Sequence, residues 1–288
     1  MQLFQRRQRR PRAVVYSNLE GFMDQDRFER AIALRNSNCA LAALQEFSAM
    51  QEESTDANDR AALILNEARC YADIGRVVDA ERTLARARDL APDDVEARFN
   101  LDVLAACVAA QGGDYEQAVC QFQTLLEDYI GILQTQEYRD FYEDIQQRKA
   151  VCLIHLHRYG EALRILKEAS SSFITLKTED EQEVHLNLGT CYAGLHEDRL
   201  AKADFLRAIE FGLKNSVEAR ACYNLGVASF LDGGFAQAKN QLEWILQTYP
   251  GEIPNVPRKD VYHQLSRTYH YLGEKDNAQR YRRLAEGP

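Results

Sequence analysis

The chain has 288 residues, 45% of them hydrophobic and 27% charged, so it can bury a sizeable core and is not disordered throughout. Its 44 acidic and 35 basic side chains give a formal net charge of −9 at pH 7, which argues against binding of nucleic acid or anionic lipid by the surface as a whole. Length alone allows two globular domains or one repetitive array.

Residues 1–23 are expected to form a flexible, basic N-terminal arm. Its first twelve residues contain no acidic side chain and five arginines: Arg6, Arg7, Arg9, Arg10 and Arg12. Three interpretations stay open. The arm is a solvated tail, an electrostatic handle for nucleic acid, a membrane surface or an acidic partner, or a segment that docks on residues 95–142, whose net charge is −6.

The protein is predicted to be located in the cytoplasm. No apolar stretch reaches the ~18 residues that a membrane-spanning helix needs, and no export signal is visible. The arginine-rich start resembles a mitochondrial transit peptide, but serine is scarce and Pro11 would interrupt an amphipathic helix. Seven cysteines without a secretion signal indicate a reducing compartment.

Residues 24–286 are predicted to be helical almost throughout. They are rich in Ala, Leu, Arg, Glu and Gln, and apolar residues recur three and four positions apart. The breaks between helical segments carry turn chemistry, at Gly75, Gly112-Gly113, Gly194, Gly233 and Gly273. Their regular spacing indicates an internal repeat.

One alanine marks the same place in each repeat. These anchor alanines lie 37, 38, 44, 39, 37 and 40 residues apart, and they are Ala43, Ala80, Ala118, Ala162, Ala201, Ala238 and Ala278. A small residue precedes each anchor by twelve positions, and a bulky apolar residue follows each of the first six by four. Small residues let paired helices approach closely, and stacking the pairs closes the core. The 44-residue interval predicts an insertion around residues 128–141.

The fifth and sixth repeats carry the most specific motifs. Leu188-Gly189-Thr190-Cys191-Tyr192 is followed by Ala201 and Phe205, and Leu225-Gly226 by Ala238 and Pro250. This L-G-x2-Y…A-x3-F pattern resembles the tetratricopeptide repeat family, although the tryptophan at the repeat start is missing. The resemblance covers residues 24–286 and implies an all-α, right-handed superhelical solenoid of about seven antiparallel helix pairs.

The resemblance also implies a binding site on the concave face, which the first helix of every repeat would line. Fourteen residues before the anchors lie Glu29, Asn66, Leu104, Arg148, Asn187, Asn224 and Gln264. An amide side chain both donates and accepts, as a peptide bond does, and related proteins hold peptide backbone with an asparagine ladder at the matching place. The alternative is that these amides are merely solvated. The candidate partner-binding residues are Asn66, Arg69, Arg148, Asn187, Tyr223, Asn224, His263, Gln264, Arg267 and Tyr271.

Neither chemistry nor a cofactor is expected. Cys70, Cys152 and Cys191 each lie ten residues before an anchor, as buried packing residues would. The histidines form no H-E-x-x-H or similar ligand set, and phosphate-binding loops and nucleophile motifs are lacking. The sequence therefore predicts a non-enzymatic scaffold or adaptor for a protein or peptide partner. The alternatives are a ligand-responsive regulatory module, and a nucleic-acid-associated protein that acts through the arm.

Overall fold

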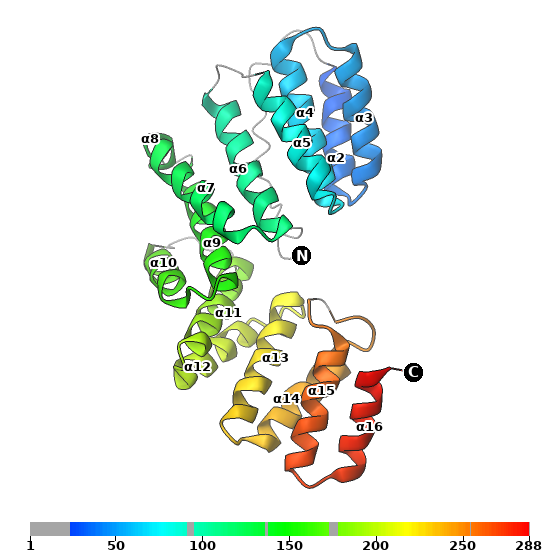
Figure 1. Ribbon diagram of the computed structural model, residues 1–288, viewed down its shortest axis with the longest axis vertical. Helices are drawn as coiled ribbons and strands as arrows, with labels where there is room; N and C mark the ends of the chain where they lie inside the picture. Colours follow the sequence, from blue (N-terminus) through cyan, green and yellow to red (C-terminus); the bar gives the residue numbers. More distant parts are fainter. Residues whose placement is uncertain (1–23, 91–94, 136–137, 173–177, 254, 288) are drawn as a thin grey trace. The chain divides into compact units, whose positions relative to one another are not determined.

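The computed structural model describes residues 24–90, 95–135, 138–172, 178–253 and 255–287 (Figure 1). The arm predicted for residues 1–23 lies outside this range. Every regular element in the described ranges is an α-helix. The all-α fold predicted from the 3.6-residue periodicity is therefore confirmed.

Within these ranges the helices follow one another in seven pairs, each joined by a turn of two or three residues. The pairs are α2 (Gln25–Asn36) with α3 (Ala40–Glu53), α4 (Ala57–Asp73) with α5 (Val77–Asp89), α6 (Val95–Gly112) with α7 (Tyr115–Asp128), α9 (Arg139–His155) with α10 (Tyr159–Ser172), α11 (Thr178–Gly194) with α12 (Asp198–Glu210), α13 (Ser216–Leu231) with α14 (Phe235–Thr248), and α15 (Arg258–Tyr271) with α16 (Lys275–Glu286). A single helical turn, α8 (Ile130–Leu133), lies where the long interval predicted an insertion.

Two of the turns show why glycine is needed there. Gly75 between α4 and α5 has φ +77°, and Gly273 between α15 and α16 has φ +80°. This left-handed conformation costs glycine nothing and is the usual way to end a helix. The breaks read from the sequence thus coincide with the ends of first helices.

The chain divides into two compact units, the first ending at Cys152 and the second beginning at Leu153, inside α9. In the first unit α3 packs against α4, α5 against α6, and α4 against α6. In the second unit α12 packs against α13, α14 against α15, and α13 against both α11 and α15. Each unit therefore has a face lined by the first helices of its pairs.

All seven anchor alanines are buried, and each is the fourth residue of the second helix of its pair. The bulky residues four positions later are also buried, as Phe47, Leu84, Phe122, Leu166, Phe205 and Leu242. In the last repeat the equivalent position holds Arg282, which is exposed and bonded to Glu286. The repeat pattern was therefore a correct guide to the packing layer.

In two helix pairs a glycine stands twelve residues before the anchor, and each lies too close to the partner helix for a Cβ atom. A Cβ atom at Gly189 would lie 2.6 Å from Cδ1 of Phe205 and 3.1 Å from the carbonyl oxygen of Ala201. The equivalent Cβ at Gly226 would lie 3.0 Å from Cγ of Leu242. The two carbon–carbon distances, 2.6 Å at Gly189 and 3.0 Å at Gly226, are shorter than normal contacts, so a larger residue at either position would push α11 from α12 or α13 from α14.

The single tryptophan of the chain is half-buried against the core of the second unit. Trp244 on α14 packs against buried residues of α13 and α15, among them Cys222, Val261 and Leu265. Its ring lies 6.3 Å from that of Tyr249, edge to face.

Candidate partner-binding face

Helix α13 leaves a single stripe of its surface unburied. It packs against α11, α12, α14 and α15, and ten of its sixteen residues are buried. The remaining six are Val217, Arg220, Tyr223, Asn224, Val227 and Leu231. At about 100° per residue these positions fall on one face of the helix. This open stripe, residues 217–231 of α13, is the inner face of the second unit.

Neighbouring helix α15 contributes a second row to the same face. Its exposed or half-buried side chains include His263, Gln264, Arg267 and Tyr271. Gln264 Oε1 accepts a hydrogen bond from Arg267 Nη1 at 3.4 Å, and the Gln264 side chain lies near the Tyr223 hydroxyl on α13. Burial raises the pKa of Tyr223 and Asp260 raises it further, while the Gln264 side chain and Arg267 oppose the shift. Tyr223 is therefore a neutral hydroxyl group at pH 7.

Seven of the ten predicted residues lie in the second unit, on the adjacent helices α11, α13 and α15. Tyr223 and Asn224 belong to the open stripe. Asn187 on α11 is only 5% exposed, so it can offer a partner much less surface than Asn224. The amide ladder is thus uneven, with Asn224 and Gln264 as its accessible members.

In the first unit the predicted Asn66 is already engaged. It is 3% exposed; its Nδ2 donates to the Ala62 carbonyl oxygen at 2.9 Å, and its Oδ1 accepts from Arg35 Nη1 at 3.2 Å. A partner would have to displace Arg35 to reach this amide. Asn66 therefore takes part in the contact between α2 and α4.

The two predicted arginines of the first unit also have partners within the protein. Arg69 Nη2 donates to Asn100 Oδ1 at 3.5 Å. Arg148 Nε donates to Asp144 Oδ2 at 2.7 Å, and its Nη1 to Cys107 Sγ at 3.7 Å. These contacts tie α4 to α6 and α9 to α6. Whether either arginine also contacts a partner stays a prediction.

Arg220 is the residue of this face that sequence reasoning missed. Its Nη1 atom is buried and has no hydrogen-bond partner. Burial lowers the pKa of the guanidinium, and the charge of Glu183 on α11 opposes that shift. Both residues lie eighteen positions before their anchors, one helical turn before the column that the sequence singled out. A comparison of that column between repeats could have found this pair.

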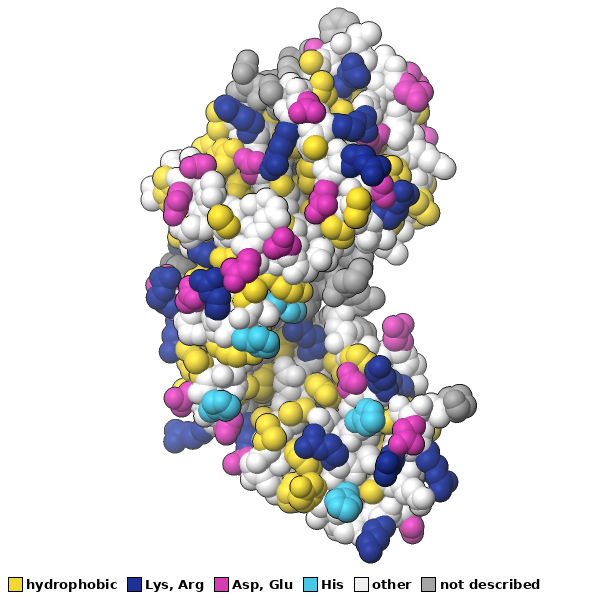
Figure 2. Space-filling model, in the orientation of Figure 1, with side chains coloured by type: hydrophobic (Ala, Val, Ile, Leu, Met, Phe, Trp, Pro, Cys, Tyr) yellow, Lys and Arg dark blue, Asp and Glu magenta, His cyan; other side chains and the backbone are white. Residues whose placement is uncertain are grey.

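An aromatic cluster closes the other end of the stripe. The ring of Phe230 lies 5.3 Å from Phe235 and 5.3 Å from Tyr271, and Phe235 and Tyr271 are stacked at 4.8 Å. The Arg267 guanidinium covers the Phe230 ring at 4.7 Å. Figure 2 shows hydrophobic surface beside basic and histidine side chains at this end of the second unit.

The cysteines are packing residues rather than a reactive set. Burial raises the pKa of the thiol to about 12 at Cys70, Cys152, Cys191 and Cys222. Cys107 is half-buried, and its pKa is also raised by burial. In the described part of the chain no three His, Cys, Asp or Glu side chains are grouped as metal ligands would be.

We expect only Cys39 and Cys120, the two exposed thiols, to react rapidly with a thiol-specific disulfide reagent at pH 8. The buried thiols are protonated and inaccessible there, and only the thiolate is a nucleophile. A stopped-flow titration should show two fast groups in the native protein and seven in 6 M guanidinium chloride. Rapid reaction of a third thiol in native buffer would contradict this assignment.

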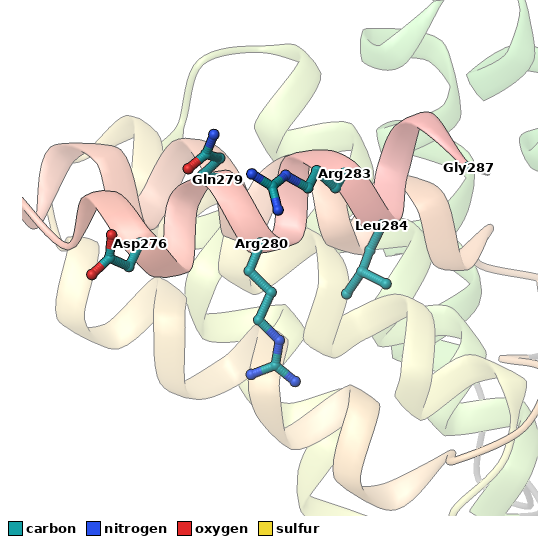
Figure 3. A pocket seen from close by; sticks show the side chains of 6 residues that line it. All are labelled: Asp276, Gln279, Arg280, Arg283, Leu284 and Gly287. Atoms are coloured by element: carbon teal, nitrogen blue, oxygen red, sulfur yellow. The ribbon is translucent and has the colours of Figure 1, made fainter.

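A shallow depression on α16 is a poor alternative site. It is lined by Asp276, Gln279, Arg280, Arg283, Leu284 and Gly287. Figure 3 shows the Arg280 and Arg283 side chains pointing in different directions, so their charges do not converge on one ligand. None of the helices described is both long and apolar enough to pass through a membrane.

Comparison with known protein families gives a match in the last helix pair. Residues 259–285 match the family model described as tetratricopeptide repeat, and they cover most of α15 and α16. This last helix pair is therefore similar to a tetratricopeptide repeat. Among solved structures, a tetratricopeptide repeat protein from Parabacteroides merdae superposes with a TM-score of 0.63 at 13% identity, covering 91% of each chain.

Two further solved structures share the fold of this chain. Pseudomonas aeruginosa PilF gives a TM-score of 0.58 at 15% identity, with 81% of this chain and 95% of PilF covered. PilW, a type IV pilus biogenesis factor, gives 0.60 at 16% identity, with 77% and 90% covered. A search among curated proteins found no match. At these identities the likeness establishes the all-α repeat solenoid and leaves function to the site.

Proposed function

We propose that the protein is a non-catalytic interaction scaffold whose second unit binds an extended segment of a partner protein. The observation that carries the proposal is the open stripe of α13, which is flanked by the polar row of α15. Tetratricopeptide repeat folds commonly use the face lined by their first helices for such binding.

The composition of the face suits a peptide. Asn224 and Gln264 lie on adjacent helices and are partly exposed, so their amides can pair with backbone N–H and C=O groups of any sequence. Tyr223, Arg267 and Tyr271 add area together with directed hydrogen bonds, which is the composition of interface hot spots. An open stripe of this length also fits an elongated ligand better than a compact metabolite.

The arm that would bind nucleic acid lies outside the described residues, and the comparison with PilF and PilW transfers only the fold. We therefore propose protein binding first, without assigning the partner to pilus assembly or to any other pathway.

Partner capture tests the proposal. The tagged protein is incubated with lysate of its native host, and the partners are identified by mass spectrometry and then titrated as purified proteins. We expect Asn224→Ala with Gln264→Ala to weaken the main partner roughly 30-fold, because each hydrogen bond contributes about 1 kcal/mol.

The matched control is Asn240→Ala with Gln279→Ala, which removes the same two amides from exposed positions on α14 and α16. This control should bind as the unmodified protein does. Equal affinity of both double variants for every captured partner would overturn the proposed face.

A further inference from the structure

We propose that the inner face of the second unit selects a partner segment in which a carboxylate side chain and a large apolar side chain are about five residues apart. Arg220 would hold the carboxylate, and the exposed surface of Leu231 and Tyr271 would hold the apolar side chain. The inference rests on the proposed function and specifies the chemistry of the ligand.

The carboxylate end follows from the state of Arg220. A guanidinium stays charged and has five N–H donors, and a buried donor without an acceptor costs about 1–3 kcal/mol. Arg220 Nη1 is such a donor, on an otherwise accessible stripe. Glu183 contributes charge from α11 but leaves Nη1 without an acceptor. A ligand carboxylate matches the planar fork of the guanidinium and would supply the missing acceptor.

Among the described residues, His155 on α9 lies close enough to Arg220 to be affected by its charge. Burial lowers the pKa of His155, and the positive charge of Arg220 lowers it further, so His155 is neutral at pH 7. In the described part of the chain, Arg220 thus presents a guanidinium whose buried Nη1 atom has no hydrogen-bond partner.

The apolar end is already assembled. Leu231 is 72% exposed and Tyr271 is 62% exposed. The Tyr271 ring packs against the rings of Phe230 and Phe235, and Leu231 directly follows Phe230 on α13. Exposed apolar side chains that are held rigidly lose little conformational entropy when a partner covers them. Arg267, which is fixed over Phe230, gives the rim of this patch a positive charge.

The spacing follows from the helix. Arg220 and Leu231 are eleven residues apart on α13, which corresponds to about 16 Å at 1.5 Å per residue. An extended chain advances about 3.3 Å per residue, so five residues span that distance. Between the two ends lie Tyr223 and Asn224, which are placed to pair with the backbone of the segment.

The test uses fluorescein-labelled twelve-residue peptides with one Glu and one Trp separated by one to nine Ser or Ala residues, titrated by anisotropy. Affinity should be highest when the two residues are four to six positions apart. Exchanging Glu for Gln in the best peptide should weaken binding at least tenfold, because a hydrogen bond between charged groups is lost.

Variants of the protein assign each end. With Arg220→Gln, the Glu and Gln peptides should bind equally. With Leu231→Ser and Tyr271→Ser, the Trp peptide and its Ala counterpart should bind equally. Arg280→Gln, an exposed arginine of α16, is the control and should change nothing. Arg220→Gln removes a charge whose burial costs free energy, so the melting temperature of this variant should not fall. Arg220→Lys is a second variant, which keeps the charge and loses the bidentate geometry.

The outcomes separate the two proposals. Peptides that bind with sensitivity to Asn224→Ala, but with no dependence on Glu or on spacing, would overturn this inference and leave the proposed function standing. Absence of peptide binding at millimolar protein also overturns it. If, in addition, the captured partners bind the Asn224→Ala, Gln264→Ala variant as tightly as the unmodified protein, the proposed function is wrong as well.

Discussion

Replacement of Phe205 by alanine is expected to lower the free energy of unfolding by about 3–5 kcal/mol. The side chain is only 1% exposed and fills the gap between α12 and α11 opposite Gly189. Its removal leaves a cavity that the close approach of the two helices cannot collapse. Urea unfolding followed by circular dichroism measures the loss.

Leu206→Ala is the matched control for Phe205. This residue is the next one on α12 and is 49% exposed, so its truncation should change stability by less than about 0.5 kcal/mol. Equal effects of the two substitutions would mean that α12 does not bury the face described here.

A methyl group added at Gly189 should also destabilise the protein, by about 1–3 kcal/mol, because it overpacks the interface between α11 and α12. Alanine is the better helix former by up to about 1 kcal/mol, yet its Cβ would lie 2.6 Å from the Phe205 ring and 3.1 Å from a backbone oxygen. Phe205 is buried and the oxygen belongs to the backbone, so neither can move aside without separating the helices.

The control for Gly189→Ala is Gly160→Ala on α10. An added Cβ there has no atom within 4 Å, so only the helix propensity changes, and a gain of up to about 1 kcal/mol is expected. Chemical denaturation of both variants checks the opposite signs. If Gly189→Ala is stabilising too, the close helix approach at this position is refuted.

The two substitutions should also couple. In Gly189→Ala combined with Phe205→Leu, the smaller side chain makes room for the new methyl group, as in the repeats where Ala68 stands with Leu84 and Ala150 with Leu166. The loss for the double variant should therefore be smaller than the sum of the two single losses.

The periodic recurrence of apolar residues predicted the helices well because it reflects which side chains are buried. Ala201 and Ala238 are fourth in their helices and fully buried, as are the anchors of the other repeats apart from slight exposure in the last. The same pattern predicted the interruption before α9, where α8 lies. Small and bulky residues at fixed spacing admit few other arrangements of helix pairs.

The inner face was harder to predict because its positions are not equivalent in space even when they are equivalent in the repeat. Asn66 and Asn224 both lie fourteen residues before an anchor, yet Arg35 covers the first and the second is partly exposed. Which long side chain reaches over its neighbour depends on tertiary packing, not on spacing. For the same reason, repeat spacing can draw attention to the position of Arg220 but cannot show that its guanidinium is partly desolvated.

Division of the chain within α9 makes the position of Trp244 useful for spectroscopy. Trp244 is the single indole of the protein and is half-buried against the core of the second unit, so its emission reports on that unit. Circular dichroism, in contrast, averages over the helices of both units. If the fluorescence and circular dichroism transitions occur at different denaturant concentrations, the repeats unfold stepwise. If the two transitions coincide, the repeats unfold cooperatively. One native fluorophore thus allows the cooperativity of unfolding to be measured without any label.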